Sequence, residues 1–359
     1  MSELYIGVMS GTSMDSIDVA LCEVSSTKCT LKASLEFSFD EQLKKDILEA
    51  INSNTTLFKI GKIDHDLGVM FASSINALLK EKNIDRKNIK AIGLHGQTLW
   101  HEPDIFSMQL GDSNIVSSRT GIDVVSDFRR KDIALGGQGA PFTPAFHNFL
   151  FQHLDGVCVL NIGGMANVSL LGDNLSGYDT GVGNVLLDFW VSKHKNISYD
   201  RDGLWAEVGE LNSELLESLL SEPYFQMSAP KSTGRELFNE AWLYTHLKKF
   251  PNISPQDVQR TLLEVTVKSI ANEIKKYPLK QVLVCGGGVK NSFLMQRLKQ
   301  ELEHLQVAST DEYGVSSDYM EAMAFAWFAR KRVHRETISL SFVTGAFKNG
   351  VLGAVYAKD

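Results

Sequence analysis

The sequence has 359 residues, of which 43% are hydrophobic and 22% charged, and its formal net charge is -7. A chain of this length exceeds what one hydrophobic core usually supports, so we expect two lobes of roughly 150 to 200 residues with a cleft between them. The acidic balance and scattered basic residues argue against nucleic acid as a partner. No stretch approaches the roughly 18 to 20 apolar residues of a membrane-spanning helix, and the first residues lack a secretory signal, so we expect a soluble, cytoplasmic protein with no membrane partner.

The cysteines and histidines do not follow the spacing of a structural metal site. Cys22, Cys29, Cys158 and Cys285 are far apart or outside any CxxC spacing. We therefore expect them to be reduced, buried thiols. HExxH is absent and no two histidines are four residues apart, which argues against a zinc protease.

The first part of the chain is predicted to open with a β-hairpin. Residues 5–9 and 17–24 are apolar or alternating, and residues 10–16 between them have turn chemistry. A third strand to about residue 39 and helices over 41–52 and 63–82 follow. Beyond them we predict a strand over 89–94, a polar loop to Gln109, a helix over 115–120, a strand over 122–126 and a long loop over 127–144.

The same strand, turn, strand pattern returns about 150 residues later. Residues 157–162 and 168–171 are apolar and flank the small-residue turn at 163–167. A turn is predicted over 178–184, and a strand over 281–285 ends at Gly286-Gly287-Gly288. Further helices are predicted over 185–194, 204–220, 256–276, 292–302 and 318–332, with strand-like segments over 340–356.

Three glycine-containing turns therefore follow apolar strands. They are Ser10-Gly11-Thr12-Ser13, Gly163-Gly164-Met165-Ala166-Asn167 and Gly286-Gly287-Gly288. Without Cβ atoms, such turns let backbone N–H groups approach phosphate oxygens. GxxxxGK[ST] is absent and no GxGxxG opens a helix, so the P-loop and Rossmann fingerprints are missing. With these two nucleotide-binding folds disfavoured, the duplicated β-hairpins indicate a fold in which two lobes bind ATP between them.

Five motifs together resemble one family. Residues 5–18 (YIGVMSGTSMDSID), 95–98 (HGQT) and 161–167 (NIGGMAN), Asp179-Thr180-Gly181 with Gly183-Asn184, and Gly286-Gly287-Gly288 with Asn291 are similar to the motifs of the anhydro-N-acetylmuramic acid kinases, in the family's order. That family lies in the actin/hexokinase/Hsp70 superfamily. The similarity extends from Tyr5 to the end of the chain. Ser16 stands where the family usually has Gly, and Val182 where it usually has Pro, both in predicted turns.

The resemblance implies a two-lobed α/β fold of the actin-like ATPase (ribonuclease H-like) type. Each lobe would be a mixed β-sheet flanked by helices, with ATP in the cleft between the lobes. We expect lobe I over residues 1–132, lobe II over 133–320, and a C-terminal helix and strands over 321–359 that return toward lobe I. The family also implies ATP and Mg²⁺ as cofactors, an amino-sugar substrate and a homodimer.

The implied reaction opens 1,6-anhydro-N-acetylmuramic acid with water and phosphorylates O6, giving N-acetylmuramic acid 6-phosphate and ADP in peptidoglycan recycling. Asp179 would be the general base that takes a proton from the water. From the residues alone, Asp179 could equally be a turn or helix-capping residue.

The resemblance also assigns the nucleotide site. Mg²⁺ would meet Asp15 or Asp18 through water, although Asp15 could simply cap its turn. The adenosine would lie against Gly286, Gly287, Gly288 and Asn291. The phosphates would meet Gly11, Thr12, Ser13, Met14, Asp15, Ser16, Ile17 and Asp18, together with Gly163, Gly164 and Asn167.

Substrate contacts are predicted from four side chains. His95 and Gln97 could hydrogen-bond sugar hydroxyls or the N-acetyl group, and Arg129 or Arg130 could form a forked pair with the lactyl carboxylate. Glu321 is a further candidate. Each has an ordinary structural alternative: a half-buried histidine, a surface ion pair, or an acidic residue in the first turn of a helix.

Three other functions fit parts of the pattern. A different sugar or carboxylate kinase of the superfamily is disfavoured by the Asp179 turn and the HGQT segment. An ATP-driven binding protein of the Hsp70 kind would need a peptide-binding domain. A glycoside hydrolase that does not use ATP would leave three phosphate-type turns without a purpose.

Overall fold

The computed structural model describes residues 2–11, 14, 16–52 and 55–359. The chain divides into two compact units: unit 1 is Met1–Leu150 with Tyr319–Asp359, and unit 2 is Phe151–Asp318. The boundary expected at 132/133 falls inside unit 1. The reason is that the rings of Phe146 and Phe149 pack at a tilt against Trp327, with ring centroids 5.7 and 5.1 Å apart, which ties residues beyond 132 to the C-terminal segment. The second boundary, expected at 320/321, lies at 318/319.

Unit 1 contains a six-stranded mixed sheet in the order β3-β2-β1-β4-β7-β13. The β1–β2 and β2–β3 pairs are antiparallel, whereas β1–β4 and β4–β7 are parallel. The predicted hairpin and third strand are thus confirmed. The strands are β1 (Glu3–Ser10), β2 (Ser16–Val24), β3 (Cys29–Ser38), β4 (Ile89–Leu94), β7 (Val124–Ser126) and β13 (Ala354–Tyr356), and β5 (Gln97–Glu102) pairs with β6 (Phe106–Leu110) in a separate hairpin.

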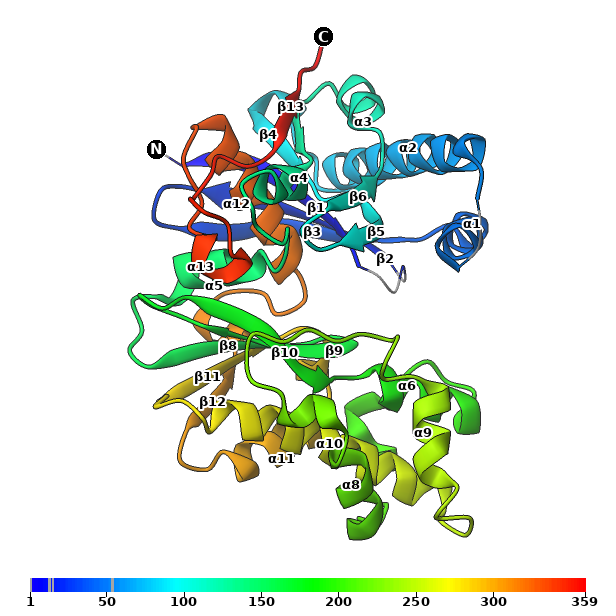
Figure 1. Ribbon diagram of the computed structural model, residues 1–359. Coiled ribbons are helices and arrows are strands. Elements are labelled where there is room, and N and C mark those ends of the chain that lie inside the picture. Colours follow the sequence, from blue (N-terminus) through cyan, green and yellow to red (C-terminus); the bar gives the residue numbers. More distant parts are fainter. Residues whose placement is uncertain (1, 12–13, 15, 53–54) are drawn as a thin grey trace. The chain divides into compact units, whose positions relative to one another are not determined.

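Helices cover both faces of this sheet (Figure 1). Ile6 and Val8 share a core with Phe71, on the side of the sheet where α1 and α2 pack. Gly7 points the other way: a Cβ there would lie 1.7 Å from the main-chain oxygen of Ala322 in α12, so only glycine allows this approach. The helices are α1 (Glu41–Asn52), α2 (Leu57–Glu81), α3 (Ser113–Thr120), α4 (Phe128–Ile133), α5 (Thr143–Phe151), α12 (Met320–Val333) and α13 (Ser341–Thr344).

Unit 2 repeats the strand order of unit 1. Its sheet runs β10-β9-β8-β11-β12, with the β8–β9 and β9–β10 pairs antiparallel and β8–β11 and β11–β12 parallel. The repetition confirms the predicted α/β fold of the ribonuclease H-like type with a mixed sheet in each half. The strands are β8 (Val157–Ile162), β9 (Met165–Leu170), β10 (Ser176–Val182), β11 (Gln281–Cys285) and β12 (Gln306–Ser309).

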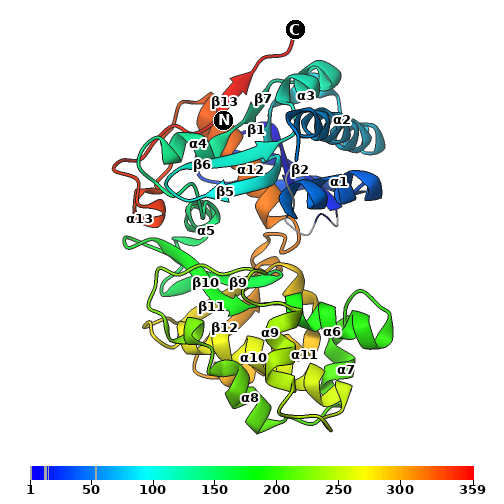
Figure 2. The same cartoon turned by 45° about the vertical axis from the view of Figure 1, so that its right-hand side comes forward.

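The helices of unit 2 gather on one side of its sheet (Figure 2). The longest, α10, packs against β9 and β10 and against four other helices. Its buried side chains share a core with Leu160 of β8 and Val282 of β11. The helices are α6 (Val185–Lys195), α7 (Leu204–Glu207), α8 (Ser213–Leu220), α9 (Glu240–Leu247), α10 (Pro255–Ile274) and α11 (Ser292–Glu301).

Several predicted elements were wrong. The loop expected up to Gln109 contains the β5–β6 hairpin, and the loop expected over 127–144 contains α4. The helix predicted over 204–220 is broken, because the chain passes so close to α10 that a Cβ on Gly209 would lie 2.6 Å from the main-chain oxygen of Gln256. The strand-like segment over 340–356 is mostly α13 and loop. Helix α9 and strand β12 were missed.

All four cysteines are buried and none forms a disulfide, as expected. Within the described residues, no helix is both long and apolar enough to cross a bilayer.

Candidate active site

Asp179 lies on a bulged strand rather than in the turn predicted for residues 178–184. The register of β10 with β9 passes from Asp179 opposite Asn167 directly to Gly181 opposite Ala166, which leaves Thr180 as an extra residue. Thr180 is fully buried and donates to the main-chain oxygen of Ala166 at 3.2 Å. Bulges bend a strand and redirect its side chains, and they are frequent beside active sites.

The loop before α9 holds one oxygen of the Asp179 carboxylate. Oδ2 accepts hydrogen bonds from the Thr233 amide at 3.0 Å and from the Ser232 hydroxyl at 3.1 Å. Within the described residues, Oδ1 has no hydrogen-bond partner. Burial raises the pKa of Asp179 above its ordinary value, the two hydrogen bonds oppose this, and the charge of Glu236 adds to it. A carboxylate with one oxygen held, one oxygen free and a raised pKa is suited to accept a proton.

A row of polar residues crosses the sheet of unit 2 at this level. Asn167 pairs with Asp179 on one side and with Asn161 on the other, and Asn161 in turn pairs with Cys285, just before the glycine turn. Asn167, predicted from its motif, therefore lies beside Asp179. Asn161, for which no role was predicted, stands in the same motif.

The Gly163–Gly164 turn is fixed to the start of α6. The amides of Gly183 and Val185 donate to the Gly164 oxygen at 2.9 and 3.1 Å, and the Asn184 amide donates to the Gly163 oxygen at 2.8 Å. A Cβ on Gly183 would lie 2.3 Å from the Gly163 oxygen, which requires glycine. Two of the predicted motifs thus form one substructure.

The structure explains the three successive glycines in different ways. Gly286 has φ +82°, and a Cβ there would lie 2.3 Å from Asn161 Oδ1. A Cβ on Gly288 would lie 2.4 Å from Cγ2 of Ile162. Gly287 has no such neighbour, since its nearest contact would be Nδ2 of Asn184 at 4.0 Å. Packing explains the outer two glycines, whereas Gly287 leaves open space.

That space is part of a cavity of about 270 Å³ within unit 2. Of the four residues predicted for adenosine, Gly287 and Asn291 line it, while Gly286 and Gly288 do not. Apart from Asn184, which stands in a motif with Gly183, the other lining residues carry no motif that would indicate a site. The lining is Asn184, Leu187, Asp188, Tyr199, Asp200, Asp202, Gly287, Lys290 and Asn291.

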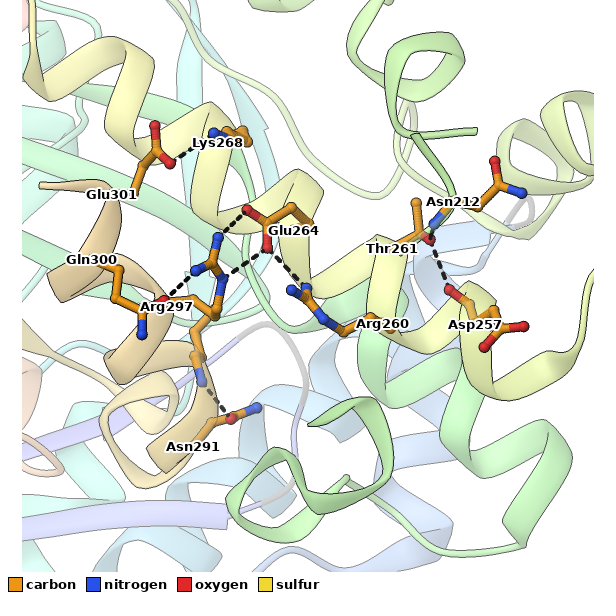
Figure 3. A network of polar contacts seen from close by, with 11 residues as sticks. Asn212, Asp257, Arg260, Thr261, Glu264, Lys268, Asn291, Arg297, Gln300 and Glu301 are labelled. Carbon is orange, nitrogen blue, oxygen red and sulfur yellow. Dashed lines mark hydrogen bonds and ion pairs between the residues drawn. The ribbon is translucent and has the colours of Figure 1, made fainter. Parts of the chain in front are cut away.

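Helix α11, which follows the glycine turn, is fixed to α10 by ion pairs to the buried Glu264 carboxylate (Figure 3). Arg297 reaches both oxygens of Glu264, at 2.9 and 3.1 Å, and Arg260 contacts the same carboxylate at 2.8 Å. Asn291 begins α11 by accepting a hydrogen bond from the Leu294 amide at 2.9 Å. Asn291 therefore has a capping role as well as a place in the cavity wall.

In unit 1 the structure brings His95 and Arg129 into contact. Nε and Nη2 of Arg129 lie 3.1 and 2.9 Å from His95 Nε2, and Nη1 donates to the Gly139 oxygen at 2.8 Å. Burial and then the Arg129 charge lower the pKa of His95, so the ring is neutral, with its proton on Nδ1; the Gly96 backbone opposes this shift. Nδ1 is buried and has no hydrogen-bond partner among the described residues.

Glu321 lies near enough to influence the same arginine. Burial lowers the pKa of Arg129 to about 10, and the charges of Glu321 and Asp132 oppose this shift. Burial raises the pKa of Glu321, and Arg129 counteracts it. Arg130 instead pairs with Asp127 at 2.7 Å and is largely exposed. Of the two candidate arginines, Arg129 is the one in the cluster.

Gln97 connects this cluster to the first hairpin. Its Oε1 accepts from the Ser10 hydroxyl at 2.5 Å, and both side chains are buried. In that hairpin the Met14 and Ile17 side chains belong to the core, so only their backbone could face a ligand. The Ser16 hydroxyl lies 3.5 Å from Asp18 Oδ1. Gly11 accepts from the Met14 amide at 3.1 Å, while Thr12, Ser13 and Asp15 lie outside the described residues.

Comparisons with known proteins agree with the motifs. The model of the anhydro-N-acetylmuramic acid kinase family matches residues 3–358. Proteins named anhydro-N-acetylmuramic acid kinase from Sulfurimonas denitrificans and Sulfurovum sp. are 57% and 55% identical, over 99% of this chain and 100% and 99% of theirs. One from Vibrio vulnificus is 50% identical, over 99% of both chains. A solved dehydratase activator from Clostridium difficile with bound ADPNP aligns over 93% of this chain and 96% of its own, at 13% identity and a TM-score of 0.47, which is too weak to bear on function. The chain belongs to the anhydro-N-acetylmuramic acid kinase family.

Proposed function

We propose that the chain catalyses the reaction named by its family. It opens 1,6-anhydro-N-acetylmuramic acid with water and transfers the γ-phosphoryl group of ATP to O6, giving N-acetylmuramic acid 6-phosphate and ADP for peptidoglycan recycling. The observation that carries this proposal is the Asp179 carboxylate, which a bulge redirects and which two hydrogen bonds hold by a single oxygen.

Asp179 acts as the general base. The free Oδ1 takes a proton from the water that attacks C1, while the bond from C1 to O6 breaks and O6 receives the phosphoryl group. A raised pKa suits this task, because it makes the carboxylate a stronger base than an exposed aspartate. In its acid–base demands, this half of the reaction resembles an inverting glycosidase.

ATP is held by the three glycine turns. The first hairpin, from Gly11 to Asp18, and the Gly163–Gly164 turn with Asn167 contact the phosphates, and the adenosine enters the cavity beside Gly287 and Asn291. The open space at Gly287 and its polar surroundings fit a nucleoside. The location of ATP between the two halves of the chain stays a prediction.

Mg²⁺ is bound mainly by the phosphates and water, near Asp15 or Asp18. No group of three or more His, Cys, Asp or Glu side chains in the described part of the chain is arranged to hold a metal ion. Mg²⁺ keeps several waters and needs only one or two carboxylates at a phosphate site. The ion would supply positive charge beside the transferred phosphoryl group.

The sugar is bound by the cluster of His95, Gln97, Arg129 and Glu321. His95 offers an unpaired N–H donor at Nδ1, the kind of buried group that a ligand oxygen would satisfy. Arg129 keeps N–H groups beyond those given to His95 and Gly139, and its burial strengthens a pair with the lactyl carboxylate. We also propose that the protein is a homodimer and acts in the cytoplasm; sedimentation of the purified protein would test the first point.

The test of the base is Asp179→Asn, assayed with the anhydro sugar and ATP and with each omitted in turn. Turnover should fall by about 100-fold or more, the range of lost general-base catalysis. Turnover within a few-fold of wild type would mean that Asp179 is not the base. A panel of other sugars and carboxylates tests the substrate.

Stability supplies a control for this variant. The folded-state pKa of Asp179 is raised, so its ionisation opposes folding as pH rises from the unfolded-state pKa through the folded one. Asparagine removes that charge but keeps an acceptor for Thr233. Asp179→Asn should therefore be at least as stable as wild type at neutral pH, and lost turnover would not reflect unfolding.

A further inference from the structure

A buried ion pair lies behind the loop that holds Asp179. Lys231 Nζ is 2.6 Å from Glu273 Oε1, with side chains 0% and 3% exposed. Lys231 comes just before Ser232 and Thr233, and Glu273 is in the last turn of α10. The ammonium also donates to the Tyr224 main-chain oxygen at 3.3 Å and lies 4.8 Å from the centre of the Tyr224 ring.

The residues around this ion pair also contact Asp179 and its neighbour Tyr178. The Tyr178 hydroxyl, one residue before Asp179, donates to Glu273 Oε2 at 3.3 Å. The Tyr224 hydroxyl donates to the Asp179 main-chain oxygen at 2.7 Å, and the Asp179 amide donates to the Lys231 oxygen at 3.1 Å. The ion pair, the strand and the loop therefore form a closed ring of contacts around the proposed base.

Stability alone does not account for such a pair. Removing two charges from water costs about as much as their attraction returns, and well-packed apolar side chains in the same place are often equally stable or more so. Buried ionic groups are better attested as devices that fix one arrangement of the chain. Here the arrangement they fix contains the Ser232 and Thr233 donors.

We infer that Lys231 and Glu273 are positioning residues for catalysis. Their ion pair sets the loop so that Ser232 and Thr233 bind one oxygen of Asp179 and leave the other free to accept a proton. This inference rests on the proposed role of Asp179 as base.

The surroundings of Asp179 supply a matched control. Tyr178, Tyr224 and Glu236 face the carboxylate or its backbone, and Tyr277 hydrogen-bonds Tyr178 at 2.9 Å. Lys276 reaches the second oxygen of Glu273 from the solvent side, at 2.8 Å and with 48% of its side chain exposed. Lys276→Ala therefore perturbs the same carboxylate without touching the loop.

The experiment compares Lys231→Met/Glu273→Leu with Lys276→Ala and wild type. Circular dichroism follows unfolding, and steady-state kinetics give kcat, KM and the pH profile of kcat/KM. The double variant should fold, with KM for ATP unchanged and kcat reduced about tenfold or more, as expected for a misplaced catalytic group. Its acidic limb should move to higher pH, because weaker loop hydrogen bonds no longer lower the pKa of Asp179. Lys276→Ala should match wild type in every measurement.

Lys231→Gln/Glu273→Gln covers the case in which the apolar double variant does not fold. It keeps hydrogen-bonding groups at both positions, leaves neither charge buried without its partner, and should move kcat and the acidic limb in the same directions by less. If either folded variant has the kcat of wild type and the same acidic limb in its kcat/KM profile, the inference is wrong. If Asp179→Asn is inactive in the same assay, such a result refutes only the positioning role; an active Asp179→Asn would refute the base itself.

Discussion

Two neighbouring glycines allow the proposed nucleotide site to be tested separately from the fold. Gly287→Ala adds a methyl group that meets nothing closer than 4.0 Å, at the wall of the 270 Å³ cavity. Gly288→Ala adds the same methyl group 2.4 and 2.5 Å from two carbons of Ile162. Neither glycine has a positive φ, so alanine is not strained by the backbone at either position.

The two substitutions should affect different properties: Gly288→Ala the stability of the fold, and Gly287→Ala the binding of ATP. Overpacking at Gly288 should cost about 1–3 kcal/mol of the free energy of unfolding, or a fall in Tm of roughly 2–4 °C per kcal/mol for a unit of this size. Gly287→Ala should leave stability equal or higher by up to about 1 kcal/mol, because alanine restricts the unfolded chain. In the cavity, the added methyl group should raise KM for ATP by about tenfold, the usual penalty for one carbon too many in a pocket.

Thermal unfolding and initial rates at saturating sugar, with ATP varied, give both quantities for each variant. Wild-type KM for ATP in a stable Gly287→Ala protein would place the adenosine elsewhere. A Gly288→Ala protein as stable as wild type would show that the turn yields at Ile162, contrary to the packing argued above.

Two further predictions concern the base and the first sheet. Activity requires ionised Asp179, so kcat/KM falls as pH drops through the pKa of this residue. Ser232→Ala removes a hydrogen bond that lowers the pKa of Asp179 and should move the acidic limb of the kcat/KM profile to higher pH. Glu236→Gln removes a charge that raises the pKa of Asp179 and should move the acidic limb to lower pH. Displacements in the same direction would contradict this electrostatic account. Gly7→Ala places a Cβ 1.7 Å from a main-chain oxygen of α12 and should lower the free energy of unfolding by about 3 kcal/mol or more, measured by urea titration; wild-type stability would show that α12 can move away from β1.

The sheets could be predicted from the sequence because their strands carry a local signal. The runs at β1, β8 and β11 are apolar and end at glycine turns, and β2 follows the first of these turns, so the limits of all four were close to those observed. The β5–β6 hairpin was missed because its residues are mostly polar and half-exposed: it includes Trp100, which is 49% exposed. Strand β5 lacks apolar alternation, and the alternation of Phe106, Met108 and Leu110 in β6 extends over only five residues.

The cavity beside Gly287 could not have been predicted from local patterns. Its lining comes from three separate segments, and Tyr199, Asp200 and Asp202 meet Gly287 only through the tertiary fold. The glycine run did indicate that something approaches the backbone. It did not show that two of the three glycines are required by Asn161 and Ile162 rather than by a ligand.

Local sequence patterns also could not show that Asp179 lies on a strand. The sequence Tyr178-Asp179-Thr180-Gly181 has the composition of a turn, and Gly181 has φ +148°, a positive value that favours glycine. Only pairing with β9 shows that the segment is a strand with one extra residue. Because the bulge, rather than a flexible turn, orients the carboxylate, we expect its geometry to depend on long-range partners such as Lys231 and Glu273. Those partners lie 52 and 94 positions further along the chain, beyond the reach of any local motif.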